Sequence, residues 1–517
     1  MTHQGALPGE LKTLTAWAAG RWGDKVGLIF DEHDVRLTYG ALDLRSNALA
    51  HVLQSIGVEP KDRVGVMLHN RPEFPLAWLA LAKIGAATVP INVFYKDFDA
   101  RYILENSGAK AVVTSSEFVP LLRNISTLKQ ILCVDDPEVL AGAPTEPTTV
   151  SVFPEDLANV QYTSGTTGRP KGCMLSHGYW VTIASKHVED TSPPLHEGDV
   201  MLTAQPFYYM DPQWNLVTAL VSGATLVVLD RFHPSTFWEK VREYGVTFFY
   251  CLGAMPTLML KTSPSPLDKQ NRVRHVSCSA IPIRLHRELE ERWGAPWHET
   301  FGMTETGSDI AVRPEEHDGL VGSGCIGRPK RGREARIVDE EGRNVPRGEI
   351  GELVLRGTGI MDGYFENEEA TDEAFRGGWF HTGDMARMDE DGLIFYVGRK
   401  KEMIRRSGEN ISAAEVEDAI GLHPDVRLVA CVPVPDELRG EEVKAYVVLE
   451  PTKESVTPKE LADFCSERLA YFKVPRYWEY RDDLPRTPSE RVAKHVLVEE
   501  KSDLRRGSYD TVEEVWK

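Results

Sequence analysis

The stretch Tyr162-Thr163-Ser164-Gly165-Thr166-Thr167-Gly168-Arg169-Pro170-Lys171-Gly172 places glycines, hydroxyl side chains and a lysine in a fixed order, directly after a predicted strand at 157–162. Glycines let the backbone turn tightly and bring its N–H groups close to an anion. The hydroxyls add donors, and Lys171 supplies a positive charge for a polyphosphate. The spacing differs from that of a Walker A loop. We therefore predict a phosphate-binding loop of another class, and a flexible surface loop is the competing interpretation.

Strand-like apolar segments alternate with helical patterns on both sides of this loop. The predicted strands are 63–68, 87–91, 111–114, 224–229 and 246–250, and the predicted helices include 74–84 and 234–244. This alternation predicts an α/β fold with a mainly parallel sheet covered on both faces. The longest apolar run, 216–229, is shorter than the roughly 20 residues that span a bilayer. It predicts a helix that breaks at Gly223 before a strand.

The second part of the chain has a different pattern. Segments 334–338 and 351–356 read as strands of a small antiparallel barrel. A boundary is expected at 398–401, followed by a compact α+β unit. Its predicted elements are a helix at 413–422 with Ser412 as N-cap, strands at 428–434 and 442–449, and a helix at 458–469. The tail after Lys494 shows no clear pattern and is expected to be partly disordered.

Composition limits the classes of function. The 517 residues carry a formal net charge of −19, which argues against a nucleic-acid-binding surface. The seven cysteines have no metal-site or C-x-x-C spacing, so reduced thiols are expected. The N-terminus lacks a basic region followed by an apolar core, so no signal peptide is expected. We expect a soluble cytoplasmic protein without a membrane span.

Three further strings carry polar residues around glycines. Residues 299–306 (ETFGMTET) combine hydroxyls with the carboxylate of Glu305, which suits Mg²⁺ beside a polyphosphate. Residues 379–384 (WFHTGD) end on Asp384, whose carboxylate could accept both ribose hydroxyls. Residues 396–411 (YVGRKKEMIRRSGENI) pack cations around glycines. Each string alone is also compatible with an ordinary solvated turn or loop.

Together, in this order, the four strings resemble the adenylate-forming superfamily, which includes acyl-CoA synthetases, luciferases and peptide-synthetase adenylation domains. The resemblance runs from residue 10 to 495. Within the superfamily the chain is most similar to the AMP-forming acyl-CoA ligases that act on carnitine and crotonobetaine. The resemblance implies a large N-terminal region of two αβ subdomains plus a distorted β-barrel, and a small mobile α+β C-terminal domain. The expected boundaries are 1–398, a hinge at 399–402, and 403–517.

The resemblance also implies roles for individual residues. The triphosphate would be held by Thr163, Ser164, Gly165, Thr166, Thr167, Gly168 and Lys171. Adenine would face Ser279, Ala280 and Ile281, with Phe301 stacking near it, while Thr304 would touch phosphate and Glu305 would bind Mg²⁺. Asp384, Tyr396 and Arg399 would hold the ribose, and Lys401 would be the hinge. Gly408 and Lys473 would serve CoA, Glu415 would order the second conformation, and Tyr208, Tyr209 and Gly302 would face the acid.

Two segments depart from the family pattern. Glu490 and Arg491 stand where Gly-Lys is expected, and that lysine normally contacts the acid and the α-phosphate. Arg491 could replace it, Lys494 could reach inward from one helical turn further, or adenylation could manage with reduced help. Tyr209 stands where many acyl-CoA ligases carry a histidine. It hints at an aromatic, polar or unusually small acid, and an ordinary packed tyrosine is the alternative.

The function implied is ATP-dependent activation of an acid to an acyl-adenylate with release of pyrophosphate, followed by transfer to CoA. The expected cofactors are ATP and Mg²⁺, with CoA as acceptor, and a homodimer is one compatible assembly. A second hypothesis replaces CoA by another acceptor, in an amide-forming ligase or a nitrite-activating diazotising enzyme acting on an aryl amine. A third treats the chain as a nucleotide-binding regulator with a decayed active site.

Overall fold

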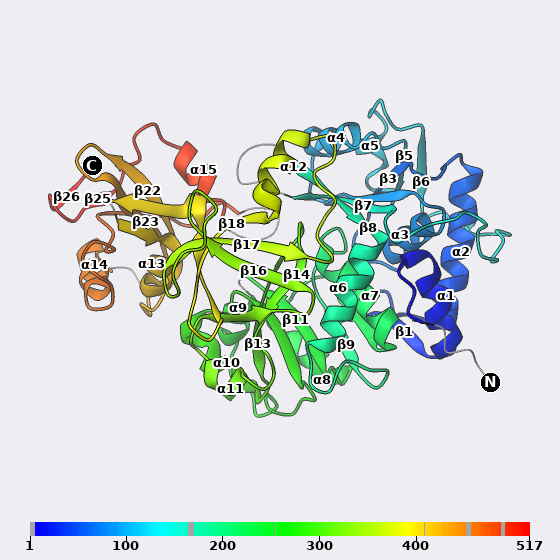
Figure 1. Cartoon of the computed structure of the whole chain (residues 1–517), viewed down its shortest axis with the longest axis horizontal. Coiled ribbons are helices and arrows are strands. Elements are labelled where there is room, and N and C mark those ends of the chain that lie inside the picture. Colours follow the sequence, from blue (N-terminus) through cyan, green and yellow to red (C-terminus); the bar gives the residue numbers. More distant parts are fainter. Residues whose placement is uncertain (1–5, 164–169, 254, 408, 451–455, 487–491) are drawn as a thin grey trace. The chain divides into compact units, whose positions relative to one another are not determined.

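Strands and helices alternate along the chain as the sequence predicts. The computed structural model describes residues 6–163, 170–253, 255–407, 409–450, 456–486 and 492–517. They fall into two compact units (Figure 1). The first unit comprises Met1–Glu334 and Leu355–Gly378, and the second comprises Ala335–Val354 and Trp379–Lys517.

A six-stranded sheet of the first unit contains the strands that flank the Gly- and Thr-rich loop. Its order is β6-β5-β3-β4-β7-β8, parallel except for the antiparallel pair β7–β8. These strands are β3 (Arg63–Met67), β4 (Ala87–Pro90), β5 (Ala111–Thr114), β6 (Gln130–Cys133), β7 (Leu157–Thr163) and β8 (Lys171–Ser176). The accompanying helices are α1 (Leu11–Trp22), α2 (Tyr39–Ser55), α3 (Glu73–Lys83), α4 (Asp97–Asn106) and α5 (Val119–Leu122). Helix α3 is apolar on almost every face and is therefore buried along nearly its whole length.

A second sheet of this unit is also mainly parallel. From β13 its order is β13-β12-β11-β9-β10-β1-β2, and antiparallel β14 and β15 continue beyond β13. The strands are β1 (Val26–Phe30), β2 (Val35–Thr38), β9 (Val200–Thr203), β10 (Thr225–Val228), β11 (Phe248–Leu252), β12 (His275–Ser279), β13 (Trp297–Met303), β14 (Gly307–Ala311) and β15 (Cys325–Pro329). Its core includes Trp238 and Trp293, whose rings stack 4.8 Å apart. The parallel α/β expectation is confirmed.

Further helices belong to the first unit. They are α6 (His177–Glu189), α7 (Met210–Ser222), α8 (Phe237–Glu243), α9 (Met255–Leu260), α10 (His286–Trp293), α11 (His317–Leu320) and α12 (Glu368–Ala374). Helices α6 and α7 pack side by side (Figure 1). Helix α7 stops at Gly223, which adopts φ +76°, and β10 follows two residues later. The run 216–229 is therefore the predicted helix-turn-strand, because glycine takes the left-handed conformation without a Cβ clash.

The second unit contains the strands predicted around 334–356 and the C-terminal α+β segment. Strands β16 (Arg333–Val338), β17 (Ile350–Gly357), β18 (Phe380–Met388) and β19 (Ile394–Arg399) are consecutive neighbours in one sheet. The other sheet has the order β21-β20-β23-β24-β25-β26, with β22 on β23. Its strands are β20 (Met403–Arg406), β21 (Glu409–Ser412), β22 (Val426–Asp436), β23 (Gly440–Leu449), β24 (Tyr477–Tyr480), β25 (Tyr509–Asp510) and β26 (Val515–Trp516). Helices α13 (Ala413–Ile420) and α14 (Pro458–Ser466) bury apolar residues in one core with β20, β23 and β24.

Two local predictions for this unit have different outcomes. Ser412 caps α13 by accepting a hydrogen bond from the Glu415 backbone N–H at 3.3 Å, as predicted. The expectation of a partly disordered tail is wrong for 494–517. Helix α15 (Lys494–Glu499) buries Leu497, and β25 extends the sheet by pairing with β24. The signal was missed because a two-residue strand has no visible periodicity in the sequence.

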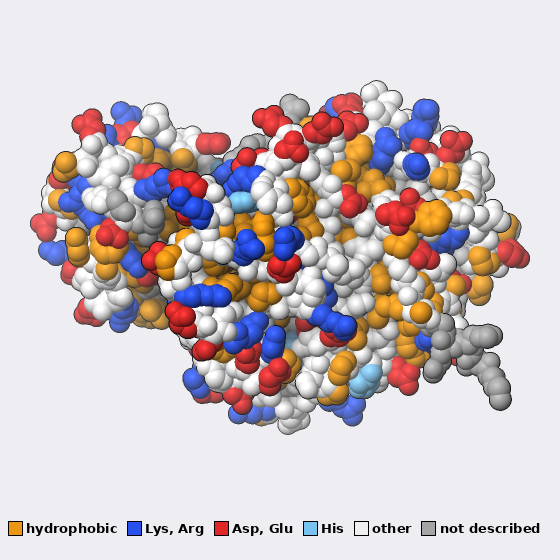
Figure 2. Space-filling model, viewed as in Figure 1, with side chains coloured by type: hydrophobic (Ala, Val, Ile, Leu, Met, Phe, Trp, Pro, Cys, Tyr) orange, Lys and Arg blue, Asp and Glu red, His pale blue; other side chains and the backbone are white. Residues whose placement is uncertain are grey.

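On the face drawn in Figure 2, charged side chains of both signs are mixed. Within the described part of the chain, every helix is too short or too polar to cross a bilayer.

Candidate active site

The ends of the predicted phosphate loop are held by two paired strands. Thr163 is the last residue of β7 and Lys171 the first of β8, and the two are direct antiparallel partners. The loop therefore starts and ends at neighbouring points of the sheet. Ser164, Gly165, Thr166, Thr167 and Gly168 lie outside the described residues.

Lys171 and Glu305 meet through a tyrosine that sequence reasoning missed. The segment 363–365 runs along β8, where the Phe365 N–H donates to the Gly172 carbonyl at 2.8 Å. This places the Tyr364 ring 4.8 Å from the Lys171 Nζ. The Tyr364 hydroxyl donates to Glu305 Oε1 at 3.1 Å. Only the fold brings the three together, because Tyr364 is distant from both of the others in sequence.

The turn that carries Thr304 and Glu305 is fixed by buried groups. The Tyr179 hydroxyl donates to the Thr304 carbonyl at 2.7 Å, and the Met361 N–H donates to the Glu305 carbonyl at 2.8 Å. Arg333 donates to the Thr306 carbonyl at 2.6 Å and pairs with Asp309, and both charged side chains are fully buried. Glu305 thus presents a hard carboxylate oxygen from a rigid turn beside a lysine. That donor set suits Mg²⁺, which commonly uses one or two carboxylates plus substrate phosphates.

Glu299 holds the loop predicted to face adenine. It accepts hydrogen bonds from the backbone N–H of Ala280 at 2.6 Å and of Ile281 at 2.9 Å. Ala280 adopts φ +65°, which is unfavourable for a residue with a Cβ and needs such support. Burial raises the pKa of Glu299 to about 8, although the two backbone N–H groups oppose the shift. The Ser279 hydroxyl donates to the Thr300 carbonyl at 3.0 Å, which ties the loop to the strand that bears Phe301.

A small cavity of about 50 Å³ adjoins this strand. Its lining residues are Ile183, His187, Met210, Asp211, Trp214, Tyr250, Ser279, Thr300, Phe301, Gly302, Met303, Gly307 and Ser308. A Cβ on Gly302 would lie 2.1 Å from the Gly307 carbonyl oxygen, so only glycine fits that wall. Met210, Asp211 and Trp214 directly follow Tyr208 and Tyr209, which pack against each other with ring centroids 4.8 Å apart. The Tyr209 hydroxyl accepts a hydrogen bond from Asn92 at 3.2 Å.

Aromatic side chains line the cavity, and the buried ion pair Asp190–Lys330 lies next to them. The His187 ring stacks on Trp214 with centroids 3.9 Å apart, and Tyr250 meets Trp214 edge-on. Beneath them, Asp190 Oδ2 lies 3.3 Å from His187 Nδ1 and is paired with Lys330, which also contacts Ser308. Burial lowers the pKa of His187 to about 4, so the ring is neutral at pH 7. His187 and Trp214 were missed in the sequence because helical core residues and pocket residues share the same pattern.

The residues predicted to hold ribose gather in the second unit. Asp384 and Arg399 are direct partners of the antiparallel strands β18 and β19. The Arg399 Nε lies 3.0 Å from Asp384 Oδ1, and the Tyr396 hydroxyl donates to the same oxygen at 3.3 Å. Asp384 is almost fully buried, whereas Lys401 is exposed. The structure therefore groups Asp384, Tyr396 and Arg399.

The remaining predicted residues of this unit have partners within it. Lys473 Nζ donates to both carboxylate oxygens of Glu415, at 2.6 and 2.8 Å. Lys494 forms ion pairs with two glutamates, at 2.8 Å each. Gly408 and Arg491 lie outside the described residues.

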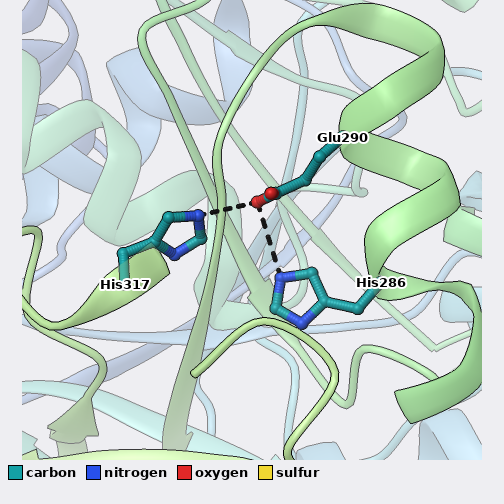
Figure 3. A group of neighbouring side chains, drawn as sticks. All are labelled: His286, Glu290 and His317. Atoms are coloured by element: carbon teal, nitrogen blue, oxygen red, sulfur yellow. Dashed lines mark hydrogen bonds and ion pairs between the residues drawn. The ribbon is translucent and has the colours of Figure 1, made fainter. Parts of the chain in front are cut away.

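One group of side chains in the first unit has the composition of a metal site. His286 and Glu290 project from α10 toward His317 (Figure 3). The Glu290 Oε1 lies 2.7 Å from His317 Nε2 and 3.6 Å from His286 Nε2. However, His286 Nδ1 accepts a hydrogen bond from the Gly322 N–H, so its Nε2 carries the proton, which it gives to the Trp297 carbonyl at 2.7 Å. A protonated Nε2 cannot bind a metal, and the group instead fixes the 317–322 segment to α10.

Comparison with known proteins adds to this geometry. The profile of the AMP-binding enzyme family matches residues 15–365, and that of the AMP-binding enzyme C-terminal domain matches 415–491. The chain belongs to the AMP-binding enzyme family. This confirms the superfamily resemblance, and the α/β architecture with a smaller C-terminal domain agrees with it.

Named relatives and proteins of known structure match nearly the whole chain. It is 34% identical to the crotonobetaine/carnitine–CoA ligase of Salmonella arizonae, over 93% of this chain and 97% of that protein. The o-succinylbenzoate CoA synthetase MenE of Bacillus subtilis, solved with an acyl-adenylate intermediate, has a TM-score of 0.86 and 27% identity, covering 95% and 99% of the two chains. MenE has also been solved with ATP and a magnesium ion. The anthranilate CoA ligase AuaEII, solved with anthranoyl-AMP, has a TM-score of 0.87 and 25% identity over 97% and 98%.

Proposed function

We propose that this chain is an AMP-forming acyl-CoA ligase that activates a short acid with ATP and transfers the acyl group to CoA. The observation that carries the proposal is the hairpin β13–β14. Its strands line the cavity, and its turn bears Thr304 and Glu305, next to Tyr364 and Lys171. The cavity is too small for a whole ligand, so one end of the acid would enter it and lie beside the groups suited to a polyphosphate and Mg²⁺.

The chemistry follows from this placement. A carboxylate oxygen of the acid attacks the α-phosphorus of ATP, and pyrophosphate leaves. Lys171 and the strand ends at Thr163 position the phosphates, and Glu305 offers a ligand to Mg²⁺, which supplies charge neutralisation when bound. In the second half-reaction the CoA sulfur attacks the acyl carbon and AMP leaves. Positioning and charge neutralisation account for most of the catalysis.

The walls of the cavity favour a particular acid. Trp214 and Tyr250 offer aromatic surface, and Asp211 adds a carboxylate. Aromatic rings and a carboxylate attract a cationic group, and neutral His187 does not repel it. Because the Salmonella relative is named for crotonobetaine and carnitine, a short acid with a quaternary ammonium group is the first substrate to test.

The second unit completes the proposal. Asp384 and Arg399 hold the ribose, and Lys401 lies in a hinge at 399–402 between an N-terminal domain (1–398) and a mobile C-terminal domain (403–517). Lys473 and Gly408 serve CoA, and Arg491 takes the place of the missing lysine. The seven cysteines all lie in the described part of the chain and form no disulfide there, which suits a reducing compartment such as the cytoplasm.

The test is pyrophosphate release from ATP against a panel of acids, with and without CoA. The panel contains quaternary ammonium acids, short and medium fatty acids, aryl acids and nitrite. We expect pyrophosphate with a short cationic acid, and acyl-CoA by mass spectrometry only when CoA is present. If the rate of pyrophosphate release does not depend on CoA but rises when an amine is added, the acceptor would be an amine and not CoA. Wild-type pyrophosphate release by Lys171→Ala would contradict the phosphate site.

A further inference from the structure

Lys494 sits at the centre of a partly buried ion-pair triangle in the second unit. It is the first residue of α15, and its side chain is only 17% exposed. Its Nζ lies 2.8 Å from Glu402 Oε2 and 2.8 Å from Glu417 Oε1. Glu402 belongs to the 3-10 turn Lys400–Glu402, and Glu417 belongs to α13. One ammonium group thus joins three elements that are separate in sequence.

The charges of the triangle are mutually dependent. Burial disfavours the ammonium form of Lys494, but Glu417 and Glu402 outweigh it and raise the pKa of the lysine. Burial raises the pKa of Glu417, and Lys494 opposes that shift. Glu417 also accepts a hydrogen bond from the Cys431 backbone N–H at 2.6 Å, which anchors it to β22. Without Lys494, two carboxylates would face each other in a partly buried site, which is unfavourable.

This arrangement leaves Lys494 poorly suited to replace the missing catalytic lysine. To reach a phosphate, its ammonium group would have to leave two carboxylates at once. Glu402, in contrast, directly precedes β20, the first strand of the C-terminal sheet. A contact that fixes Glu402 therefore fixes the point where the chain leaves the expected hinge and enters that sheet.

We propose that Lys494 is a positioning residue that ties the hinge segment, through Glu402, to helix α13, through Glu417. It acts on the alternation between the two half-reactions and does not contact the reacting atoms. The kinetic part of this inference rests on the proposed adenylating function, whereas the tether itself does not.

The kinetic test measures the two half-reactions separately, as pyrophosphate release and as thioester formation from supplied acyl-adenylate. We expect Lys494→Met to shift the ratio of the two rates at least about fivefold, since a hydrogen bond to a charged group is worth about one to two factors of ten. Glu402→Gln should shift the ratio in the same direction, and combining the two should add little. Lys494→Arg should restore the wild-type ratio, because a guanidinium group can pair with both carboxylates.

A matched variant separates the tether from general destabilisation. Lys501→Met removes another ion pair of the same unit, in which Lys501 Nζ lies 2.8 Å from Glu479. It should lower stability without changing the ratio. The double variant Lys494→Met/Glu417→Gln relieves the repulsion between the carboxylates but does not restore the tether. The ratio should remain shifted in this double variant, and its return to the wild-type value would overturn the inference.

A measurement independent of activity completes the design. Amide hydrogen exchange of a peptide covering 399–406 should be about tenfold faster in Lys494→Met than in wild type or Lys501→Met. Unchanged exchange would refute the tether. A large loss of pyrophosphate release in Lys494→Met, with Glu402→Gln at wild-type rates, would assign Lys494 to the reacting atoms instead. If the wild-type protein activates no acid, the proposed function fails, and hydrogen exchange still decides the tether.

Discussion

Replacing Glu299 by glutamine tests how the loop 279–281 is held in its binding conformation. The carboxylate accepts two backbone hydrogen bonds, from Ala280 at 2.6 Å and Ile281 at 2.9 Å. The amide of glutamine keeps one acceptor oxygen but turns an N–H₂ donor toward the other N–H group. Above pH 8, where the carboxyl group of Glu299 is ionised, the variant loses one bond to a charged acceptor, worth about 1.5–3 kcal/mol. Since Ala280 has φ +65°, the loop has little intrinsic preference for this conformation.

At pH 9 we therefore expect KM for ATP to be about 10- to 100-fold higher in Glu299→Gln than in wild type, because 1.4 kcal/mol corresponds to a factor of ten. The turnover number at saturating ATP should change much less. The assay is pyrophosphate release at varied ATP concentration. Glu316→Gln, which removes a carboxylate paired with Arg328 at 2.7 Å, is the control and should leave KM for ATP unchanged.

The pH dependence gives this prediction a second signature. The pKa of Glu299 is raised to about 8, so its carboxyl group ionises between pH 7 and 9 and then accepts both N–H groups more strongly. KM for ATP should fall over that range in the wild type but not in Glu299→Gln. For stability the sign is opposite: the unfolded chain loses this proton at lower pH than the folded protein, so the free energy of unfolding falls as pH rises toward 8. An unchanged KM together with an unchanged pH profile in Glu299→Gln would refute the reasoning.

Three other perturbations follow from the first unit. Tyr364→Phe removes the hydroxyl that donates to Glu305 at 3.1 Å and keeps the ring near Lys171, so the Mg²⁺ concentration for half-maximal pyrophosphate release should rise about tenfold. An unchanged Mg²⁺ requirement would count against Glu305 as the ligand. Trp214→Leu enlarges the cavity, so kcat/KM should fall for short acids and rise for longer ones. The change per methylene should correspond to about 1–3 kcal/mol of transition-state binding, and measuring kcat/KM for acids of increasing chain length tests it. His177 is fully buried with its pKa lowered to about 4 by burial, so the unfolded chain takes up the proton first as pH falls. This residue should therefore cost about 1.4 kcal/mol of stability per pH unit between roughly pH 6.5 and 4. Denaturation of His177→Leu should therefore show a shallower pH slope than that of the wild type, and an equal slope would refute the reasoning.

The sequence by itself determined the alternation of strands and helices, and it predicted a phosphate-binding loop at 162–172. Periodicity and breakers such as Gly223 are local properties, because φ, side-chain volume and capping depend on a few neighbouring residues. The N-cap of α13 at Ser412 was predictable for the same reason. Lys171, Glu305 and Asp384 were also visible as candidates, since the chemistry of polyphosphate and ribose restricts which side chains can serve, and their roles stay predictions.

Only the tertiary structure decided which distant residues support these motifs. Tyr364 reaches Glu305 because its segment lies along β8, and Glu299 holds Ala280 because β12 and β13 are parallel neighbours. His187 and Trp214 form a cavity wall from two different helices. From the sequence, Lys494 was one candidate to replace the missing catalytic lysine. In the structure it lies beside Glu402 and Glu417 and forms an ion-pair triangle with them. Such contacts depend on strand order and helix packing, which bring together residues whose separation along the chain carries no signal of their proximity.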